Sequence, residues 1–279
     1  MRVAVTGASG FIGRHVVAEL ARRGLDLVLA TRDSSLVRQP AAGRVVELDL
    51  DAPGPEVLEQ LGCPDVLVHL AWGGLPNYRS ATHFEVELPR QYRFLKQLVD
   101  AGLKSLLITG TCAEYGMQSG PLAEDLPSAP VHAYGHAKDA LRRQLVLLQE
   151  AKPFALTWAR LFFMYGDGQP ASSLLPQLEA AVRRGDQVFN MSGGEQLRDY
   201  LPVTEVARCL VALLLAGDGH GVVNVCAGQP ISVRRLVENH LAALGRDLRL
   251  NLGHYPYLDY EPMAFWGDRR RLDEILSGP

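Results

Sequence analysis

Tyr134 and Lys138, near the middle of the chain, have the types and spacing of a phenolic acid/base. They lie four residues apart in Tyr-Gly-His-Ala-Lys, at the start of a segment whose pattern predicts a long helix. Residues four apart share a helix face, so the Lys138 ammonium can lie beside the phenol and favour its ionised form. An unperturbed tyrosine titrates at about 10, and a general acid works best with a pKa near the operating pH. We therefore expect Lys138 to lower the pKa of Tyr134, although the same spacing also occurs on solvated helix faces.

A glycine-rich turn near the N-terminus predicts a dinucleotide site that could supply a cofactor to this tyrosine. The apolar strand Val3–Thr6 runs into Gly7, Gly10 and Gly13, and helix-forming residues follow through Arg23. Strand, glycine turn and helix in this order allow a tight turn, close approach of the backbone to a pyrophosphate, and an anion at the helix N-terminus. The residues of the turn expected to contact the cofactor are Gly7, Ser9, Gly10, Phe11, Ile12 and Gly13.

The end of the second strand bears on the choice between NADP(H) and NAD(H). Strand Leu27–Thr31 is followed by Arg32 and Asp33. An arginine here suits a 2′-phosphate and an acidic residue suits a ribose hydroxyl, so Arg32 favours NADP(H) while Asp33 keeps NAD(H) possible. Further cofactor contacts are expected after the third and fourth strands, from Asp49, Leu50, Leu70, Ala71 and Trp72.

Strands that alternate with helices predict an α/β fold with a doubly wound parallel sheet of the Rossmann type. The predicted strands are Val3–Thr6, Leu27–Thr31, Val45–Leu48, Val66–Leu70, Ser105–Thr109 and Phe154–Arg160. In such a sheet, ligands bind beyond the carboxyl ends of the strands. We expect residues 1–165 to form the dinucleotide-binding domain. Residues 166–279 should form mainly a smaller C-terminal substrate lobe, from which strands can return to the first domain.

Composition argues against several other classes of protein. The chain has 279 residues, 21% of them charged, and a net charge of −3, which gives no reason to expect nucleic acid or a membrane surface as a partner. Its first residues read as a buried strand and no apolar run could span a bilayer, so we expect a cytoplasmic protein. The cysteines and histidines show no metal-ligand spacing, and we expect reduced thiols and no metal.

Five segments in this order resemble the extended short-chain dehydrogenase/reductase superfamily, in its nucleotide-sugar epimerase, dehydratase and reductase branch. They are residues 6–13 (TGASGFIG), Thr111 ahead of Tyr115-Gly116, the Tyr134/Lys138 pair, Ala159–Gly166 and Arg198–Val203. The resemblance implies that Thr111, Tyr134 and Lys138 are catalytic, with Tyr134 as proton donor and Thr111 hydrogen-bonded to the substrate carbonyl. Lys138 would also hold the nicotinamide ribose. It implies substrate contacts from Thr111, Cys112, Phe163 and Arg198, the last on a diphosphate, where a planar guanidinium fits phosphate oxygens. The alternative for Arg198 is a salt bridge to Glu195 or Asp199.

The chain departs from the family pattern at positions that distinguish its subtypes. Cys112 and Ala113 stand where related 4,6-dehydratases carry an Asp-Glu pair, so a dehydratase is disfavoured. Glu114, one residue later, either faces the substrate or caps the loop. Phe163 and Glu87 each stand where the family generally has an asparagine, which puts the binding mode of the substrate and any family proton relay in question.

The resemblance leaves several functions open. The short chain and Arg32 favour an NADPH-dependent reductase of a 4-keto-6-deoxy nucleotide sugar, serving surface polysaccharide biosynthesis. The segment His69–Tyr78 is similar to that of 6-deoxy-talose-type 4-ketoreductases. The alternatives are an NAD-dependent nucleotide-sugar 4-epimerase, a carbonyl reductase for non-nucleotide substrates, and a non-catalytic dinucleotide-binding regulator. The resemblance also implies a homodimer.

Overall fold

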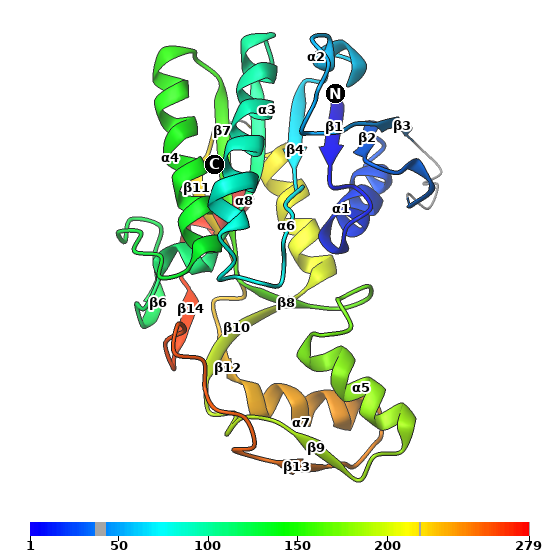
Figure 1. Cartoon of the computed structure of the whole chain (residues 1–279), viewed down its shortest axis with the longest axis vertical. Coiled ribbons are helices and arrows are strands. Elements are labelled where there is room, and N and C mark those ends of the chain that lie inside the picture. Colours follow the sequence, from blue (N-terminus) through cyan, green and yellow to red (C-terminus); the bar gives the residue numbers. More distant parts are fainter. Residues whose placement is uncertain (37–42, 218, 279) are drawn as a thin grey trace.

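Seven parallel strands form the central sheet of the protein. The computed structural model describes residues 1–36, 43–217 and 219–278 (Figure 1). The strands lie in the order β11-β7-β5-β4-β1-β2-β3, and every neighbouring pair is parallel. Their bounds are Arg2–Thr6 (β1), Asp26–Thr31 (β2), Arg44–Glu47 (β3), Val66–His69 (β4), Ser105–Thr111 (β5), Ala155–Leu161 (β7) and Gly221–Val225 (β11). The predicted doubly wound parallel sheet is confirmed, and its strand order reverses between β1 and β4, where ligands bind in such sheets.

Helices cover both faces of the sheet because successive side chains of a strand point to opposite sides. Val3 and Val5 of β1 pack into one apolar cluster, and Ala4 between them packs into the other. The first cluster lies under α1 (Phe11–Arg22), α6 (Val203–Leu215) and α8 (Arg270–Ser277). The second lies under α2 (Val57–Gln60), α3 (Leu88–Asp100) and α4 (Ala133–Ala151). None of the helices described is long and apolar enough to cross a membrane.

A smaller layer packs below the carboxyl ends of the strands (Figure 1). Its core lies between α5 (Leu174–Arg184) and α7 (Val233–Ala243). Short strands complete it: β8 (Phe163–Tyr165), β10 (Leu197–Pro202) and β12 (Pro230–Ser232) in one sheet, and β9 (Val188–Asn190) with β13 (Arg249–Asn251) in another. A further pair joins β6 (Gly120–Leu122) to β14 (Phe265–Gly267). Since β11, α6 and α8 belong to the main layer, the chain after residue 165 contributes to both layers.

Three local details of the helices bear on the site or on what the sequence could show. Ser232 caps α7, because its hydroxyl accepts the Arg235 N–H at 3.1 Å. The helical segment before β5 begins with a π-type turn, η2 (His83–Glu87), and α3 starts at Leu88. Pro89 thus lies in the first turn of α3, where its missing N–H costs nothing. Helix α2 was not expected, since four residues are too few to show a helical period.

Candidate active site

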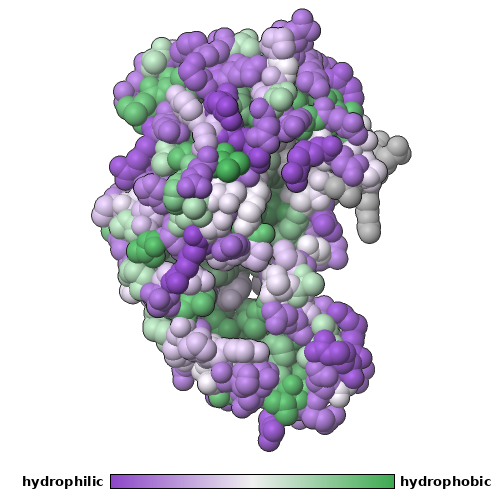
Figure 2. Space-filling view, in the orientation of Figure 1, coloured by the Kyte–Doolittle hydropathy of each residue, from purple (hydrophilic) through white to green (hydrophobic). Residues whose placement is uncertain are grey.

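A cavity of about 650 Å³ lies between the two layers, at the carboxyl ends of β1, β4 and β5. In the space-filling view the surface is hollowed between the upper and lower parts of the molecule, with hydrophobic residues around the hollow (Figure 2). The tertiary structure brings together in its wall most of the residues that the sequence singled out. They are Gly7, Gly10, Phe11, Ile12, Gly13, Leu70, Trp72, Thr111, Cys112, Tyr134, Lys138 and Phe163.

The glycine turn has the shape that a dinucleotide needs. Gly7 has φ +72°, and a Cβ on it would lie 2.8 Å from the Ala71 backbone nitrogen, so no side chain fits there. A Cβ on Gly13 would overlap the Gly7 carbonyl, which shows how closely α1 approaches the turn. No side chain caps the N-terminus of α1, and its first turn has no acidic residue. The free N–H groups of this turn therefore suit a pyrophosphate, and the residues present fit a nicotinamide dinucleotide.

The residues expected around the adenosine end of the cofactor lie outside the cavity, at the ends of β2 and β3. Ser9 Oγ lies 3.4 Å from Thr31 Oγ1, which links the glycine turn to the end of β2. Arg32 is exposed, and it has no polar partner within the described residues. Asp33 is bonded instead to Ser35, whose hydroxyl and backbone N–H lower the pKa of this carboxyl. Arg32 is thus free to meet an anion, and Asp33 is engaged.

Asp49 and Leu50 follow β3 at the same edge of the sheet. Asp49 is exposed and its carboxylate accepts the Asp51 N–H at 3.0 Å, while Leu50 is partly buried against the second apolar cluster. Neither residue is part of the cavity wall, so their predicted contact with the cofactor stays a prediction.

Tyr134 occupies the first turn of α4, and its phenol is buried in an aromatic setting. The rings of Trp72, Tyr78 and His83 lie 6.0, 5.6 and 5.3 Å from its ring. Burial raises the pKa of Tyr134, the nearby Tyr78 and Glu114 add to the rise, and a hydrogen bond from Thr111 opposes it. The expectation that Lys138 lowers this pKa is therefore wrong for the free protein, because loss of water disfavours the phenolate more than any neighbour favours it.

Lys138 lies deep in the same wall. Its ammonium donates to the Thr109 carbonyl oxygen at 2.9 Å and sits 4.0 Å from the centre of the Trp72 ring. Burial lowers the pKa of Lys138 to about 7, although Glu114 and Glu87 oppose this shift. The four-residue spacing correctly placed both side chains on one face of α4, but desolvation dominates the titration of both.

Thr111 is held at the end of β5 by a reciprocal cap. Its Oγ1 accepts the Ala113 N–H at 3.2 Å, and the Glu114 carboxylate accepts the Thr111 N–H at 2.9 Å, at the start of the 3-10 turn η3 (Cys112–Tyr115). This capping box uses Thr111 Oγ1 as an acceptor, so its one hydroxyl proton can be donated: to Tyr134 in the free protein and to a substrate oxygen that takes this place. Thr111 is therefore fixed as a donor toward the cavity.

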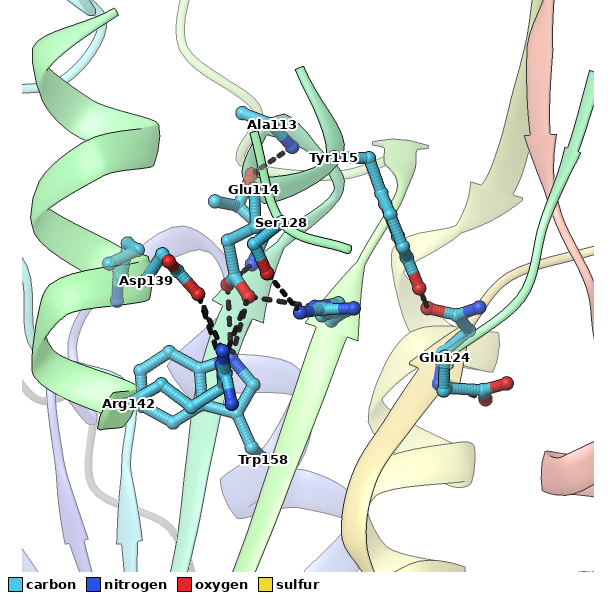
Figure 3. A network of polar contacts seen from close by, with 12 residues as sticks. Ala113, Glu114, Tyr115, Glu124, Ser128, Asp139, Arg142 and Trp158 are labelled. Atoms are coloured by element: carbon cyan, nitrogen blue, oxygen red, sulfur yellow. Dashed lines mark hydrogen bonds and ion pairs between the residues drawn. The ribbon is translucent and has the colours of Figure 1, made fainter. Parts of the chain in front are cut away.

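Glu114 resolves the choice left open by the sequence, because it caps the loop and does not line the cavity. Its side chain is 0% exposed, and it accepts from Trp158 Nε1 at 3.0 Å and from Arg160 Nε at 2.7 Å. Trp158, Arg142 and Ser128 gather around this carboxylate (Figure 3). Arg160 Nη2 also donates to Ser128 Oγ at 3.0 Å. A buried carboxylate with this many donors has its hydrogen bonds satisfied and fixes the loop that carries Thr111.

The two residues that follow Thr111 carry no carboxylate of the kind that an elimination needs. Cys112 lines the cavity, and burial raises the pKa of its thiol, so it remains protonated at neutral pH. Ala113 follows, and Glu114 faces the other way. Phe163 also lines the cavity and packs against Tyr200 and Phe265, giving an apolar wall where the family generally has an asparagine.

Arg198 lies one layer behind the cavity wall. Its side chain is 5% exposed, its Nη2 lies 3.0 Å from Glu261 Oε2, and its Nη1 donates to the Leu197 and Met263 carbonyl oxygens. Its guanidinium packs on Phe265 at 4.6 Å. The ion pair is thus with Glu261, not with Glu195 or Asp199, since Asp199 accepts from the backbone of Ala227 and Gly228. Glu261 itself lines the cavity, so Arg198 can bind an anion there only if its ion pair with Glu261 breaks.

A buried polar chain behind β4 escaped prediction. Glu87 accepts from Gln91 Nε2 at 2.9 Å, Gln91 Oε1 lies 2.8 Å from His69 Nε2, and His69 Nδ1 lies 2.7 Å from Thr6 Oγ1. Burial, with Lys138 nearby, lowers the pKa of His69 to about 3, so its ring is neutral. The sequence signal that was available is the helical spacing of Glu87 and Gln91, which puts both side chains on one face.

Comparison with known proteins agrees with this geometry. The sequence profile of the NAD dependent epimerase/dehydratase family matches residues 3–226. The chain belongs to this family. The resemblance to extended short-chain dehydrogenases/reductases is confirmed, and the chain is an NAD(P)-dependent oxidoreductase of that type.

Several proteins similar to this chain have names or solved structures that contain a nucleotide sugar. The dTDP-6-deoxy-L-talose 4-dehydrogenase (NAD(+)) of Aggregatibacter actinomycetemcomitans is 27% identical over 270 residues, 96% of this chain and 99% of that protein. The dTDP-6-deoxy-L-talose 4-dehydrogenase (NAD(P)(+)) of Kitasatospora kifunensis is 32% identical over 248 residues, 85% of this chain and 77% of that protein. A solved structure of MoeE5 with UDP-glucuronic acid and NAD superposes with a TM-score of 0.85, at 27% identity, and covers 100% of this chain and 93% of that one.

Proposed function

We propose that this oxidoreductase reduces the 4-keto group of a nucleoside-diphosphate 4-keto-6-deoxy sugar and, in reverse, oxidises the 4-hydroxyl. The observation that carries the proposal is the position of Thr111 and Tyr134 in the wall of one cavity, with the glycine turn at its other end. The relatives named for 6-deoxy-talose 4-dehydrogenation support the choice of sugar and of carbon.

The chain's own groups have separable tasks in this reaction. A bound nicotinamide supplies the hydride that reaches the sugar carbon. Tyr134 gives its phenolic proton to the 4-oxygen as the C–O bond becomes single, and Thr111 donates a hydrogen bond to the same oxygen. Lys138, one turn further along α4 than Tyr134 and with a pKa of about 7, can exchange a proton at neutral pH. The apolar wall around Phe163 excludes water and strengthens each of these interactions.

The proposed cofactor is NADP(H), with NAD(H) as the alternative. Both Arg32 and Asp33 are exposed at the end of β2, but Asp33 is bonded to Ser35, while Arg32 has no polar partner among the described residues. A guanidinium at this place suits a 2′-phosphate. The two talose relatives carry NAD(+) and NAD(P)(+) in their names, so the preference of this chain rests on Arg32.

A 4-epimerase is the second candidate, because UDP-glucose 4-epimerase of Corynebacterium glutamicum is 28% identical over 266 residues, 85% of this chain and 79% of that protein. A carbonyl reductase for a non-nucleotide substrate is the third candidate. Arg198 forms an ion pair with Glu261, which lines the cavity, and this pair takes up the guanidinium that a diphosphate would need.

One assay separates these functions. The purified protein is incubated with dTDP-6-deoxy-L-talose, GDP-6-deoxy-D-talose or UDP-glucose, each with NAD⁺ and with NADP⁺, and cofactor reduction is followed by absorbance. Net reduction with a talose nucleotide is the expected result. Conversion of UDP-glucose to a 4-epimer without net cofactor reduction would establish the epimerase instead, and no reaction with any nucleotide sugar would refute the proposal. A homodimer, a cytoplasmic location and a role in polysaccharide biosynthesis stay predictions.

A further inference from the structure

His132 is a cavity-wall residue that no step above uses. It directly precedes the turn that carries Tyr134, and it lines the same cavity. Its ring stacks on the Tyr134 ring, with the planes 10° apart and the centres at 6.3 Å. Tyr260 packs edge-on against it at 5.6 Å and Tyr78 lies at 5.7 Å. The imidazole is thus held next to the proton donor by rings from three segments of the chain.

The cap that His132 makes fixes the position of its proton. The N-cap residue of α4 is His132, whose Nδ1 accepts the Gly135 N–H at 3.2 Å. An imidazole nitrogen that accepts carries no proton, so the proton of the neutral ring lies on Nε2. Burial lowers the pKa of His132 and outweighs a hydrogen bond to its own backbone, which raises it; His83 and Arg79 add to the lowering, so the ring is neutral at pH 7.

Nε2 of this ring is free to meet a ligand. Nε2 has no hydrogen-bond partner among the described residues. A buried nitrogen without a partner is found elsewhere in the described chain but not here, so Nε2 is open to solvent. Nδ1 and Nε2 lie on opposite sides of the ring, and Nδ1 faces the helix. The N–H therefore points away from the first turn of α4, and His132 is one of the residues that line the cavity.

We propose that His132 Nε2–H donates a hydrogen bond to the hydroxyl next to the reacting carbon and so makes His132 a specificity-determining residue. The proposal rests on the function proposed above. In a 6-deoxyhexose, C4 has one hydroxyl-bearing neighbour, C3, because C5 carries the methyl group and the ring oxygen. The 3-hydroxyl is consequently the group that His132 would select, beside the 4-oxygen that Tyr134 and Thr111 hold.

The cap and the donor can be separated by substitution. Serine and asparagine are favourable N-cap residues, so H132S and H132N keep the helix start, while H132S removes any donor at the place of Nε2. H136S, at an exposed position on the same helix, is the matched control. With dTDP-6-deoxy-L-talose we expect H132S to lower kcat/KM about tenfold, with the affinity for NADPH and the unfolding temperature equal to those of H136S.

The 3-deoxy analogue of this substrate completes a double-mutant cycle. The wild-type protein should lose about tenfold in kcat/KM on the analogue, and H132S should lose little further, because both changes remove one hydrogen bond. Two results would overturn the inference and leave the proposed function intact. In the first, the wild-type protein is active and H132S keeps the full kcat/KM. In the second, H132S shows a further loss of about tenfold when it is given the analogue. A wild-type protein that neither binds nor oxidises the nucleotide sugar would refute the proposed function, and the inference with it. H132N keeps the cap and also a side-chain N–H donor, so its loss should be no larger than that of H132S; a loss in H132N that H132S lacks would indicate a packing effect and overturn the inference.

Discussion

Glu114→Ala is expected to be among the most destabilising single substitutions near the active site. Glu114 is 0% exposed and Arg160 is 2% exposed, so the substitution leaves a guanidinium buried without its ion-pair partner and with only neutral side chains such as Ser128 to accept from it among the described residues. Removal of one partner from a buried ion pair costs about 3–5 kcal/mol, a large part of a total stability of about 5–15 kcal/mol. At about 2–4 °C per kcal/mol for a chain of this class, the unfolding temperature should fall by about 6–20 °C.

The same substitution should lower activity through Thr111. Without the carboxylate, the Thr111 N–H loses its acceptor and half of the capping box is gone. We expect kcat to fall while the affinity for the cofactor stays near that of the parent, because the glycine turn is untouched.

The measurement is urea unfolding together with steady-state kinetics. Glu205→Ala is the matched control, since it breaks an ion pair to Arg208 whose side chains are 41% and 58% exposed, and such surface pairs contribute about 0–1 kcal/mol. The E114L/R160M double variant should recover part of the loss, because apolar groups can replace a buried pair. If E114A costs no more than E205A, then Glu114 does not hold this loop and the reasoning is refuted.

Four further predictions concern the site. Replacing Tyr134 with Phe should reduce kcat on the order of 10²–10⁴ and leave cofactor affinity unchanged in a titration; an equally active variant would exclude the tyrosine as proton donor. Replacing Arg32 with Ala should weaken NADPH about tenfold or more with little change for NADH, and a parallel loss of both would show that Arg32 does not meet the 2′-phosphate. Arg198→Met should raise KM for a nucleotide sugar and Glu261→Gln should lower it, because Glu261 competes for the guanidinium; if KM is the same in both variants, the substrate carries no diphosphate at this place. Burial lowers the pKa of His69 to about 3, so below about 6.5 the unfolded chain takes up a proton that the folded chain does not. The free energy of unfolding should therefore decrease as the pH is lowered, by about 2 kcal/mol at pH 5. In urea unfolding experiments, His69→Gln should lack this decrease.

The sequence by itself determined the parts of the protein that depend on neighbouring residues. The glycine turn between β1 and α1 follows from local spacing, because only glycine fits where the turn meets Ala71. The alternation of strands and helices was enough to give the parallel sheet, since each strand must bury its side chains on two faces. The common face of Tyr134 and Lys138 follows from the geometry of one helix.

Only the tertiary structure decided what these groups do electrostatically and which residues meet them. Burial sets the directions in which the pKa values of Tyr134 and Lys138 shift, and burial is a property of the folded chain. Arg198 meets Glu261, which is 63 residues away in the chain, and Glu114 meets Arg160, which is 46 residues away. Pairings at such distances depend on how the layers pack, and no local pattern carries them. Thus the type of reaction was readable from short motifs, while the protonation of the site and the partners of its charged groups arise from packing and desolvation.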